Sequence, residues 1–187
     1  MRLSKRLKAI TEFVDKEDRI IDIGCDHALL DIYIKENADR VIILGDIFPY
    51  GYYDVDFDRK EYIDLLSSFN NLYLIRGNCD SDLDIETSNQ TFFDSFMISV
   101  GGKTLYCTHG NIYNSYNLPN SFFDIMVYGH LHKGFISKKD NHVFANPGSI
   151  AFPRGGSVNS YLIVTEKMIF FKDLSGNVID SLNLEEI

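Results

Sequence analysis

Short apolar runs alternate with helix-like segments in the first half of the chain. The strand-like runs are brief and end at or near a glycine, as at Gly24, Gly45 and Gly77. The segments between them place apolar residues at helical spacing. This alternation of strand and helix favours parallel pairing within one sheet. We expect strands over 19–23, 41–44 and 72–75, helices over 3–15, 28–37 and 60–69, and a loop over 47–57.

The second half of the chain has mostly strand-like patterning. Gly101 and Gly102 separate two alternating segments, which is a strong signal for a β-hairpin. We therefore predict a single α/β domain over residues 1–187, with two packed sheets and helices outside them. The expected strands of this half cover 96–100, 103–107, 125–128, 135–137, 143–145, 161–165, 168–172 and 178–182.

The composition is that of a globular protein, with 187 residues and 45% hydrophobic content. No segment has the roughly 18 uninterrupted apolar residues of a membrane span. The basic first eight residues precede no long apolar run, so we expect no secretion signal and a cytoplasmic protein. The three cysteines form no CxxC pair, which favours reduced thiols over a disulfide framework. They are Cys25, Cys79 and Cys107.

The net charge of −9 also limits the choice of partners. A protein that follows a nucleic-acid backbone usually carries a basic face, and beyond the first eight residues we expect none here. We expect neither a nucleic acid nor a membrane as partner. An acidic chain can still bind a small phosphate ester when bound metal ions supply the positive charge.

Candidate metal ligands gather where predicted strands end, each beside a glycine. The set is Asp46, Asn78, His109, His130 and His132. Glycine lets the backbone turn sharply next to an ion. A carboxylate can bridge two cations, while imidazoles and an amide oxygen leave the pair net positive. Mixed nitrogen and oxygen ligation favours manganese, with nickel, iron or zinc as alternatives.

Taken singly, each of these residues has a simpler explanation. A Gly-Asp pair after a strand is common, and a lone histidine is more often a hydrogen-bonded structural residue. It is the joint occurrence, in this order and including His130-Leu131-His132, that favours a metal site. His142 belongs to no motif, and we expect it on the surface.

This motif series resembles the calcineurin-like metallophosphoesterases. The similarity lies in Gly45-Asp46, Gly77–Asp80, Thr108–Gly110 and Gly129–His132, and it extends over about residues 39–187. Asn117–Pro119, Asn146–Ser149 and Pro153–Gly156 further resemble the small bacterial YfcE-type phosphodiesterases. The resemblance implies a two-sheet αββα sandwich and metal-dependent hydrolysis of phosphodiesters.

The resemblance also implies roles for the residues. Asp46 would bridge two divalent ions, with Asn78, His109 and His130 completing one position and His132 serving the other. His109 and Asn78 are the expected catalytic residues. This subgroup usually has a second histidine where the present chain has Asn111, so a proton-donor role at that position is in question.

The N-terminal segment 1–38 departs from the family pattern. The family opens with a strand ending in Asp-x-His, which supplies two ligands to the first metal position. Here the corresponding strand ends in Asp22-Ile23-Gly24, so Asp22 is the candidate replacement and the first position is expected to be weak or empty. Residues 3–37 instead resemble the start of a TrmK-type tRNA adenine methyltransferase, which suggests a fusion.

Three functions remain open at this point. The first is a two-metal phosphodiesterase acting on a small phosphodiester. The second is a phosphoesterase-like scaffold that binds a partner with weak catalysis, and the missing Asp-x-His favours it. The third, a methyltransferase fragment, has no later catalytic motif. Homo-oligomer formation is a further expectation, drawn from the family alone.

Overall fold

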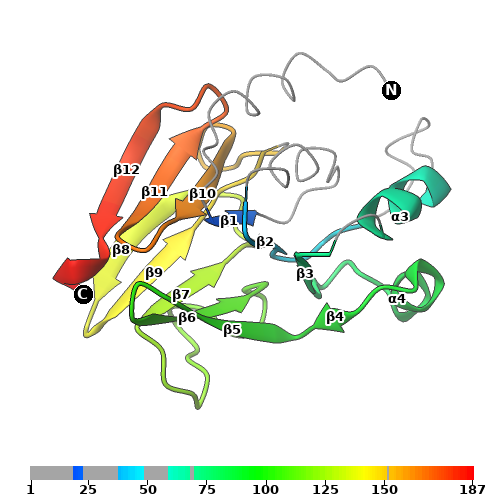
Figure 1. Cartoon of the computed structure of the whole chain (residues 1–187), viewed down its shortest axis with the longest axis horizontal. Coiled ribbons are helices and arrows are strands. Elements are labelled where there is room, and N and C mark those ends of the chain that lie inside the picture. Colours follow the sequence, from blue (N-terminus) through cyan, green and yellow to red (C-terminus); the bar gives the residue numbers. More distant parts are fainter. Residues whose placement is uncertain (1–18, 23–37, 49–58, 68–69, 151) are drawn as a thin grey trace.

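The computed structural model of the chain describes residues 19–22, 38–48, 59–67, 70–150 and 152–187 (Figure 1). These residues form two β-sheets with helices α3 and α4 beside one of them. The helices predicted over 3–15 and 28–37, and most of the loop predicted over 47–57, lie outside the described residues.

The first sheet has the strand order β12-β11-β10-β1-β2-β3-β4. As predicted, β1, β2 and β3 pair in parallel, and the two-residue β4 extends them. An antiparallel meander completes the sheet by pairing β10 with β1. The bounds are β1 Arg19–Asp22, β2 Val41–Ile43, β3 Leu72–Ile75, β4 Phe92–Phe93, β10 Ser160–Val164, β11 Met168–Asp173 and β12 Val178–Asn183, followed by the 3₁₀ helix η1 Leu184–Glu186.

The second sheet has the order β5-β6-β7-β9-β8. Its strands β6, β7 and β9 are parallel, while β5 and β8 pair antiparallel at the two edges. The predicted hairpin joins β5 to β6, and Gly101 and Gly102 both have positive φ, as a tight hairpin turn requires. The bounds are β5 Ser95–Val100, β6 Lys103–Thr108, β7 Ile125–Tyr128, β8 Phe135–Lys139 and β9 His142–Asn146.

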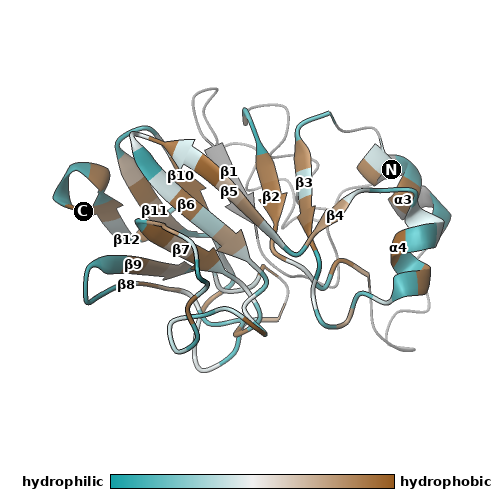
Figure 2. Ribbon diagram, turned by 90° about the horizontal axis from the view of Figure 1, so that it is seen from below, coloured by the Kyte–Doolittle hydropathy of each residue, from teal (hydrophilic) through white to brown (hydrophobic). Residues whose placement is uncertain are grey.

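The main core lies between the two sheets, where alternate residues of each strand meet. From the first sheet, Ile42 and Leu162 point inward, and from the second sheet Leu105 and Val127 do so. Their neighbours Ile43 and Met126 belong to separate clusters on the outer faces. Central strands buried on both faces read as continuous apolar runs, which is why β2, β3 and β7 are almost wholly hydrophobic (Figure 2).

Helix α3 spans Arg59–Ser67 and confirms the helix predicted over 60–69, as far as the described residues extend. Its Leu66 is buried with Ile43 and Leu74 on the outer face of the first sheet. Helix α4, Asp82–Ser88, was not predicted, because its short polar sequence lacks an apolar stripe. It is started by a capping box, in which the Ser81 hydroxyl accepts from the amide of Asp84.

The two-sheet sandwich is therefore as expected, but the covering layers differ. In the described part of the chain, helices accompany only the first sheet. On the outer face of the second sheet, Tyr106, Phe123 and Phe144 pack against one another, and Tyr113 from the loop after β6 contacts Tyr106 edge-on. A loop rather than a helix thus lies over this face.

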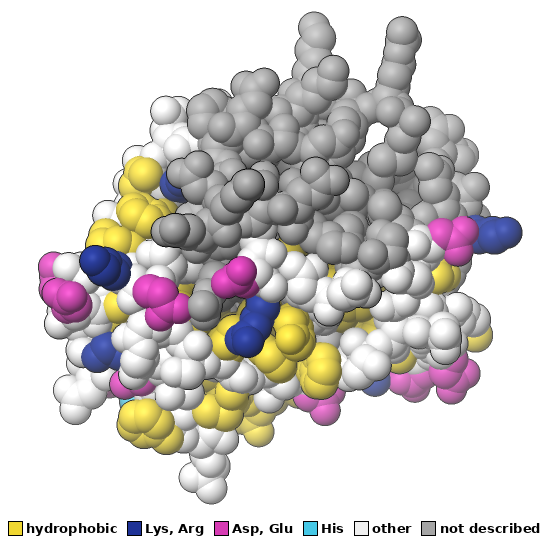
Figure 3. All heavy atoms as spheres, viewed as in Figure 1, with side chains coloured by type: hydrophobic (Ala, Val, Ile, Leu, Met, Phe, Trp, Pro, Cys, Tyr) yellow, Lys and Arg dark blue, Asp and Glu magenta, His cyan; other side chains and the backbone are white. Residues whose placement is uncertain are grey.

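Among the described residues, neither α3 nor α4 has the length and hydrophobicity needed to cross a bilayer. On the face shown in Figure 3, the described Lys and Arg side chains stand singly among acidic and apolar ones. The described cysteines, Cys79 and Cys107, form no disulfide with each other, and burial raises the pKa of Cys107 to about 12.

Candidate metal centre

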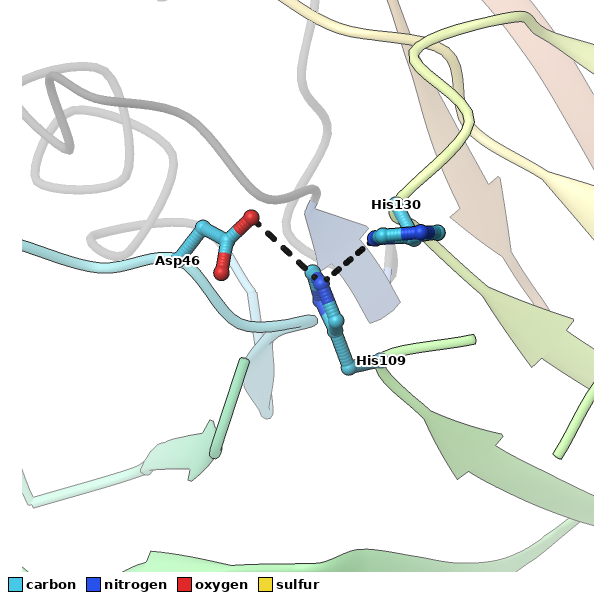
Figure 4. A group of neighbouring side chains, drawn as sticks. All are labelled: Asp46, His109 and His130. Carbon is cyan, nitrogen blue, oxygen red and sulfur yellow. Dashed lines mark hydrogen bonds and ion pairs between the residues drawn. The ribbon is translucent and has the colours of Figure 1, made fainter. Parts of the chain in front are cut away.

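Four polar side chains from four strand ends meet where the two sheets come together. They follow β2, β3, β6 and β7, and are Asp46, Asn78, His109 and His130, respectively. The Nε2 atom of His109 lies 3.1 Å from Asn78 Oδ1 and 3.1 Å from His130 Nδ1. It also lies 3.4 Å from Asp46 Oδ2. Figure 4 shows three of these side chains converging, with ligand atoms that all lie within 4.8 Å of one another.

The hydrogen bond on the other side of the His109 ring makes this convergence informative. Its Nδ1–H donates to the carbonyl of Leu44 at 2.6 Å, a bond that crosses from one sheet to the other. The other ring nitrogen, Nε2, points at the oxygens of Asn78 and Asp46, so these three atoms converge on one point. Imidazole nitrogens and carboxylate or amide oxygens are all ligands of divalent metal ions. A metal-ligating histidine also usually donates its other ring N–H to a carbonyl, as His109 does to Leu44. The residues therefore fit a divalent metal ion.

Asp46 is held in a demanding backbone conformation, with φ 55. Its Oδ1 accepts from the amide of Cys79 at 2.9 Å, which leaves Oδ2 directed toward His109. Burial opposes ionisation, but hydrogen bonding and charge from His109, together with Cys79, outweigh it and hold the pKa of Asp46 below its ordinary value. The carboxylate is thus ionised and ready to act as a ligand.

Asp80 fixes both loops that carry the first-sheet ligands. Asp80 is 2% exposed, and its carboxylate accepts from the amides of Asp46 at 3.0 Å and Gly77 at 2.8 Å. It also accepts from Ile47 at 2.7 Å and Phe48 at 3.2 Å. Burial raises the pKa of Asp80 more than the amide hydrogen bonds lower it. One carboxylate thus accepts hydrogen bonds from four backbone amides in the loops that follow β2 and β3.

In the sequence, Asp80 stands within the Gly77–Asp80 motif, and the pattern predicts no role for it. The predicted turn after β3 does indicate that an acceptor is needed, since a buried chain reversal leaves backbone amides without partners. Which amides these are depends on how the two loops meet, and no residue pattern along the chain reveals it.

Gly45 and Gly77 allow the two loops to touch. Gly45 has φ 97, and a Cβ there would lie 2.5 Å from His109 Nδ1 and 2.7 Å from the Cα of Gly77. A Cβ on Gly77 would collide with the backbone nitrogen and Oδ1 of Asp46. Any side chain at either position would therefore displace a candidate ligand, which explains why glycine precedes Asp46 and Asn78.

His130 and His132 lie in a turn whose backbone is also left-handed, with φ 62 and 55. The turn is held by Asn146, which is fully buried and donates from Nδ2 to the carbonyl of Gly129 at 2.6 Å. Burial and the nearby His109 lower the pKa of His130, which favours the neutral, ligating ring. In the sequence, Asn146 stands in the Asn146–Ser149 segment that resembles the family, but the sequence predicted no role for its side chain.

The remaining predicted site residues are placed as follows. His132 lies outside the 4.8 Å group of described residues, and its Nδ1–H donates to the carbonyl of Phe152 at 3.0 Å, which leaves Nε2 available. Asp22 ends β1 opposite Ile43, at the sheet edge from which Asp46 follows, but its side chain lies outside the described residues. Asn111 is exposed.

The surface placement expected for His142 was wrong. Its ring is half-buried, lies 4.4 Å from the ring of Phe123 between centroids, and donates from Nδ1 to the Phe123 carbonyl at 3.0 Å. Because β7 and β9 are parallel, this residue at the start of β9 lies at the opposite end of the sheet from His130. It has a packing role there, away from the ligand group.

Residues 22–168 match the calcineurin-like phosphoesterase superfamily domain. This match covers most of the chain, so the protein belongs to that superfamily and is a phosphoesterase by class. The match begins within the segment for which a methyltransferase resemblance was noted; that resemblance stays untested, because residues 3–18 and 23–37 lie outside the described part.

Individual relatives agree with this assignment. Over 143 residues the chain is 27% identical to the phosphodiesterase YfcE of Escherichia coli, covering 71% of this chain and 76% of the relative. The solved structure of YfcE, described as a phosphoesterase from E. coli, matches with a TM-score of 0.73 at 22% identity, covering 88% and 97%. Zinc-bound Vps29 of Entamoeba histolytica shares the fold with a TM-score of 0.57 at 18% identity, covering 89% and 97%.

Proposed function

We propose that the protein is a metal-dependent phosphodiesterase that works with two metal positions at the joined strand ends. Asp46, Asn78, His109 and His130 would hold one ion. Asp46 would also contact a second ion, with His132 and Asp22 as its other protein ligands. A small phosphodiester is the proposed substrate, and manganese is the ion that the ligand set favours.

The observation that carries this proposal is the environment of His109 Nε2. The Nδ1–H of the buried His109 ring donates to the Leu44 carbonyl. On the other side of the ring, Nε2 faces an amide oxygen, a carboxylate oxygen and a second imidazole at 3.1 to 3.4 Å. All of these groups are metal ligands by type, and they converge on one point from four different strand ends.

The bound ions would supply positive charge to the phosphoryl oxygens and lower the pKa of a nucleophilic water. The protein's part is to hold the ligands still. Leu44 fixes the ring of His109, Cys79 and Asp80 fix Asp46, and Asn146 fixes the turn of His130. We assign His109 to ligation because both its nitrogens are committed. Asn78 is exposed and is the ligand best placed to touch substrate as well.

The direct test is hydrolysis of bis-p-nitrophenyl phosphate by the purified chain with added manganese. We expect p-nitrophenolate release well above that of a matched sample containing chelator. The same rate in both samples would reject the enzyme proposal. Stoichiometric metal binding without turnover would instead support a phosphoesterase-like scaffold, the alternative that the missing Asp-x-His favours.

We expect the two metal positions to differ in affinity. The first has four protein ligands, whereas the second has Asp46 and His132 with Asp22 as candidate, and an ion with few protein ligands keeps more water in its shell. Calorimetric titration of the metal-free chain with manganese should resolve one tight and one weak step. Asp22→Ala should weaken only the weaker step. Two equally tight ions, unaffected by Asp22→Ala, would contradict this account of the N-terminal segment.

A further inference from the structure

The chain is acidic overall, yet the segment that carries His130 and His132 is locally basic. Residues 126–159 include one acidic residue, Asp140, and four cationic ones: Lys133, Lys138, Lys139 and Arg154. A cluster of positive charge beside a site for phosphate esters is a candidate for substrate recognition. The existing hydrogen bonds of each Lys or Arg side chain decide whether that side chain is available to bind a substrate.

Two of the four cations already have partners. Lys138 donates to the carbonyl of Glu186 at 3.0 Å. Lys139 donates to the carbonyl of Ser115 at 3.1 Å and lies over the ring of Tyr116. Both serve to attach neighbouring segments to the edge strand β8. By contrast, the exposed side chains of Lys133 and Arg154 make no ion pair or hydrogen bond with any of the described residues.

Lys133 and Arg154 lie beside the turn that carries His130 and His132. The amide of Arg154 donates to the carbonyl of His132 at 2.8 Å, and His132 Nδ1 donates to the carbonyl of Phe152. The Ser157 hydroxyl accepts from the amide of Gly134 at 3.1 Å, which attaches the far end of the segment. A Cβ at Gly155 would lie 3.3 Å from Lys133 Cδ, so Lys133 runs along this segment.

These hydrogen bonds hold the backbone of residues 152–157 against residues 132–134. The charged ends of Lys133 and Arg154 have no partner within the described part of the chain. Arginine offers a planar set of donors that matches phosphate, and lysine adds a compact positive charge. The scissile phosphate would be held by the bound metal ions. Cations next to that position therefore suit a second anionic group on the same molecule.

We propose that Arg154 and Lys133 form a subsite for a second phosphate of the substrate, on the part of the molecule beyond the scissile phosphodiester. This inference rests on the proposed phosphodiesterase function and narrows its substrate class to phosphodiesters that carry an additional phosphate. Arg154 is the principal anchor because its backbone is bound to the ligand turn itself.

A matched pair of chromogenic substrates tests this inference. Thymidine 5′-(p-nitrophenyl phosphate) and its 3′-phosphorylated derivative release the same p-nitrophenolate and differ only in the second phosphate. We expect kcat/KM to be about tenfold higher for the 3′-phosphorylated substrate, as one charge-assisted hydrogen-bonded contact provides. Arg154→Gln should bring the ratio of the two kcat/KM values close to one, and Arg154→Lys should restore part of it.

Lys167→Gln is the matched control. Lys167 is an exposed cation in the turn between β10 and β11, at the opposite end of the first sheet from Asp22 and Ser160. Its replacement by glutamine should leave the ratio of the two kcat/KM values unchanged. The ratio should also fall as salt is added, because exposed charges are screened. A ratio near one in the unaltered protein, or one that Arg154→Gln leaves unchanged, would overturn the subsite.

A binding measurement separates this inference from the proposed function. The affinities of the manganese-loaded protein for thymidine 5′-monophosphate and thymidine 3′,5′-bisphosphate can be compared by calorimetry without any turnover. The subsite predicts tighter binding of the bisphosphate and loss of that difference in Arg154→Gln. If neither chromogenic substrate is hydrolysed but this difference appears, the phosphodiesterase proposal fails and the subsite stands. Equal affinities would reject the subsite.

Discussion

Replacing Asp46 with asparagine should lower kcat/KM for bis-p-nitrophenyl phosphate by at least about a hundredfold. Loss of an outer-shell partner of a metal ligand already costs about 10- to 100-fold, and Asp46 is proposed as a direct ligand shared by both ions. Asparagine has the same shape and can still accept from the amide of Cys79. What it loses is the negative charge that binds the cations.

The fold of Asp46→Asn should therefore be retained, as checked by circular dichroism of the metal-free protein. Manganese affinity measured by calorimetry should fall together with activity. His142→Ala is the control, since His142 lies at the opposite end of its sheet and should leave kcat/KM nearly unchanged. Comparable losses of activity in the two variants would show that the site has been misplaced.

Asp80→Ala should lower the free energy of unfolding of the metal-free protein by about 3 kcal/mol or more. The change leaves the amides of Asp46, Ile47, Phe48 and Gly77 without their acceptor, and an unsatisfied buried donor costs about 1–3 kcal/mol. Metal affinity should fall as well, because these amides belong to the loops that carry Asp46 and Asn78. Denaturant unfolding with chelator measures the first effect, and calorimetry measures the second.

Asp82→Ala provides the matched control two residues away. Asp82 is exposed, and among the described residues its carboxylate pairs only with Arg76, at 2.7 Å. A surface pair of this kind contributes about 0–1 kcal/mol. If Asp80→Ala does not fold, Asp80→Asn keeps one acceptor oxygen and should show an intermediate loss. Equal stability of the Asp80 and Asp82 variants would refute the proposed role of Asp80.

Much of the architecture could be predicted from the linear pattern, because that pattern reports local requirements. The apolar runs of β2, β3 and β7 follow from burial on both faces, and the Gly101-Gly102 pair follows from the φ values of a tight turn. Helix α4 could not be predicted in this way. Its stability comes from the Ser81 capping box and not from an apolar stripe.

The candidate ligands could also be named from the sequence, since Asp46, Asn78, His109 and His130 each follow an apolar strand beside a glycine. The reason is again local: parallel strands bring their carboxyl ends to one edge, and a ligand turn needs glycine for close backbone approach. The family resemblance assigned His132 to the other metal position, and in the structure it lies outside the group formed by Asp46, His109 and His130.

Only the tertiary structure decided how this edge is organised. The sequence determined which residues could bind a metal and that parallel strands would present them together. Packing of one sheet on the other decided that the Leu44 carbonyl orients His109. The pairing of β2 with β3 brought four amides of two loops to Asp80, and the loops after β7 and β9 placed Arg154 beside His132, with no side-chain partner among the described residues. These contacts join residues far apart in the chain, and their partners are mostly backbone groups. Backbone groups are the same in every residue, so no pattern of side chains records which of them a fold will leave in need of a partner.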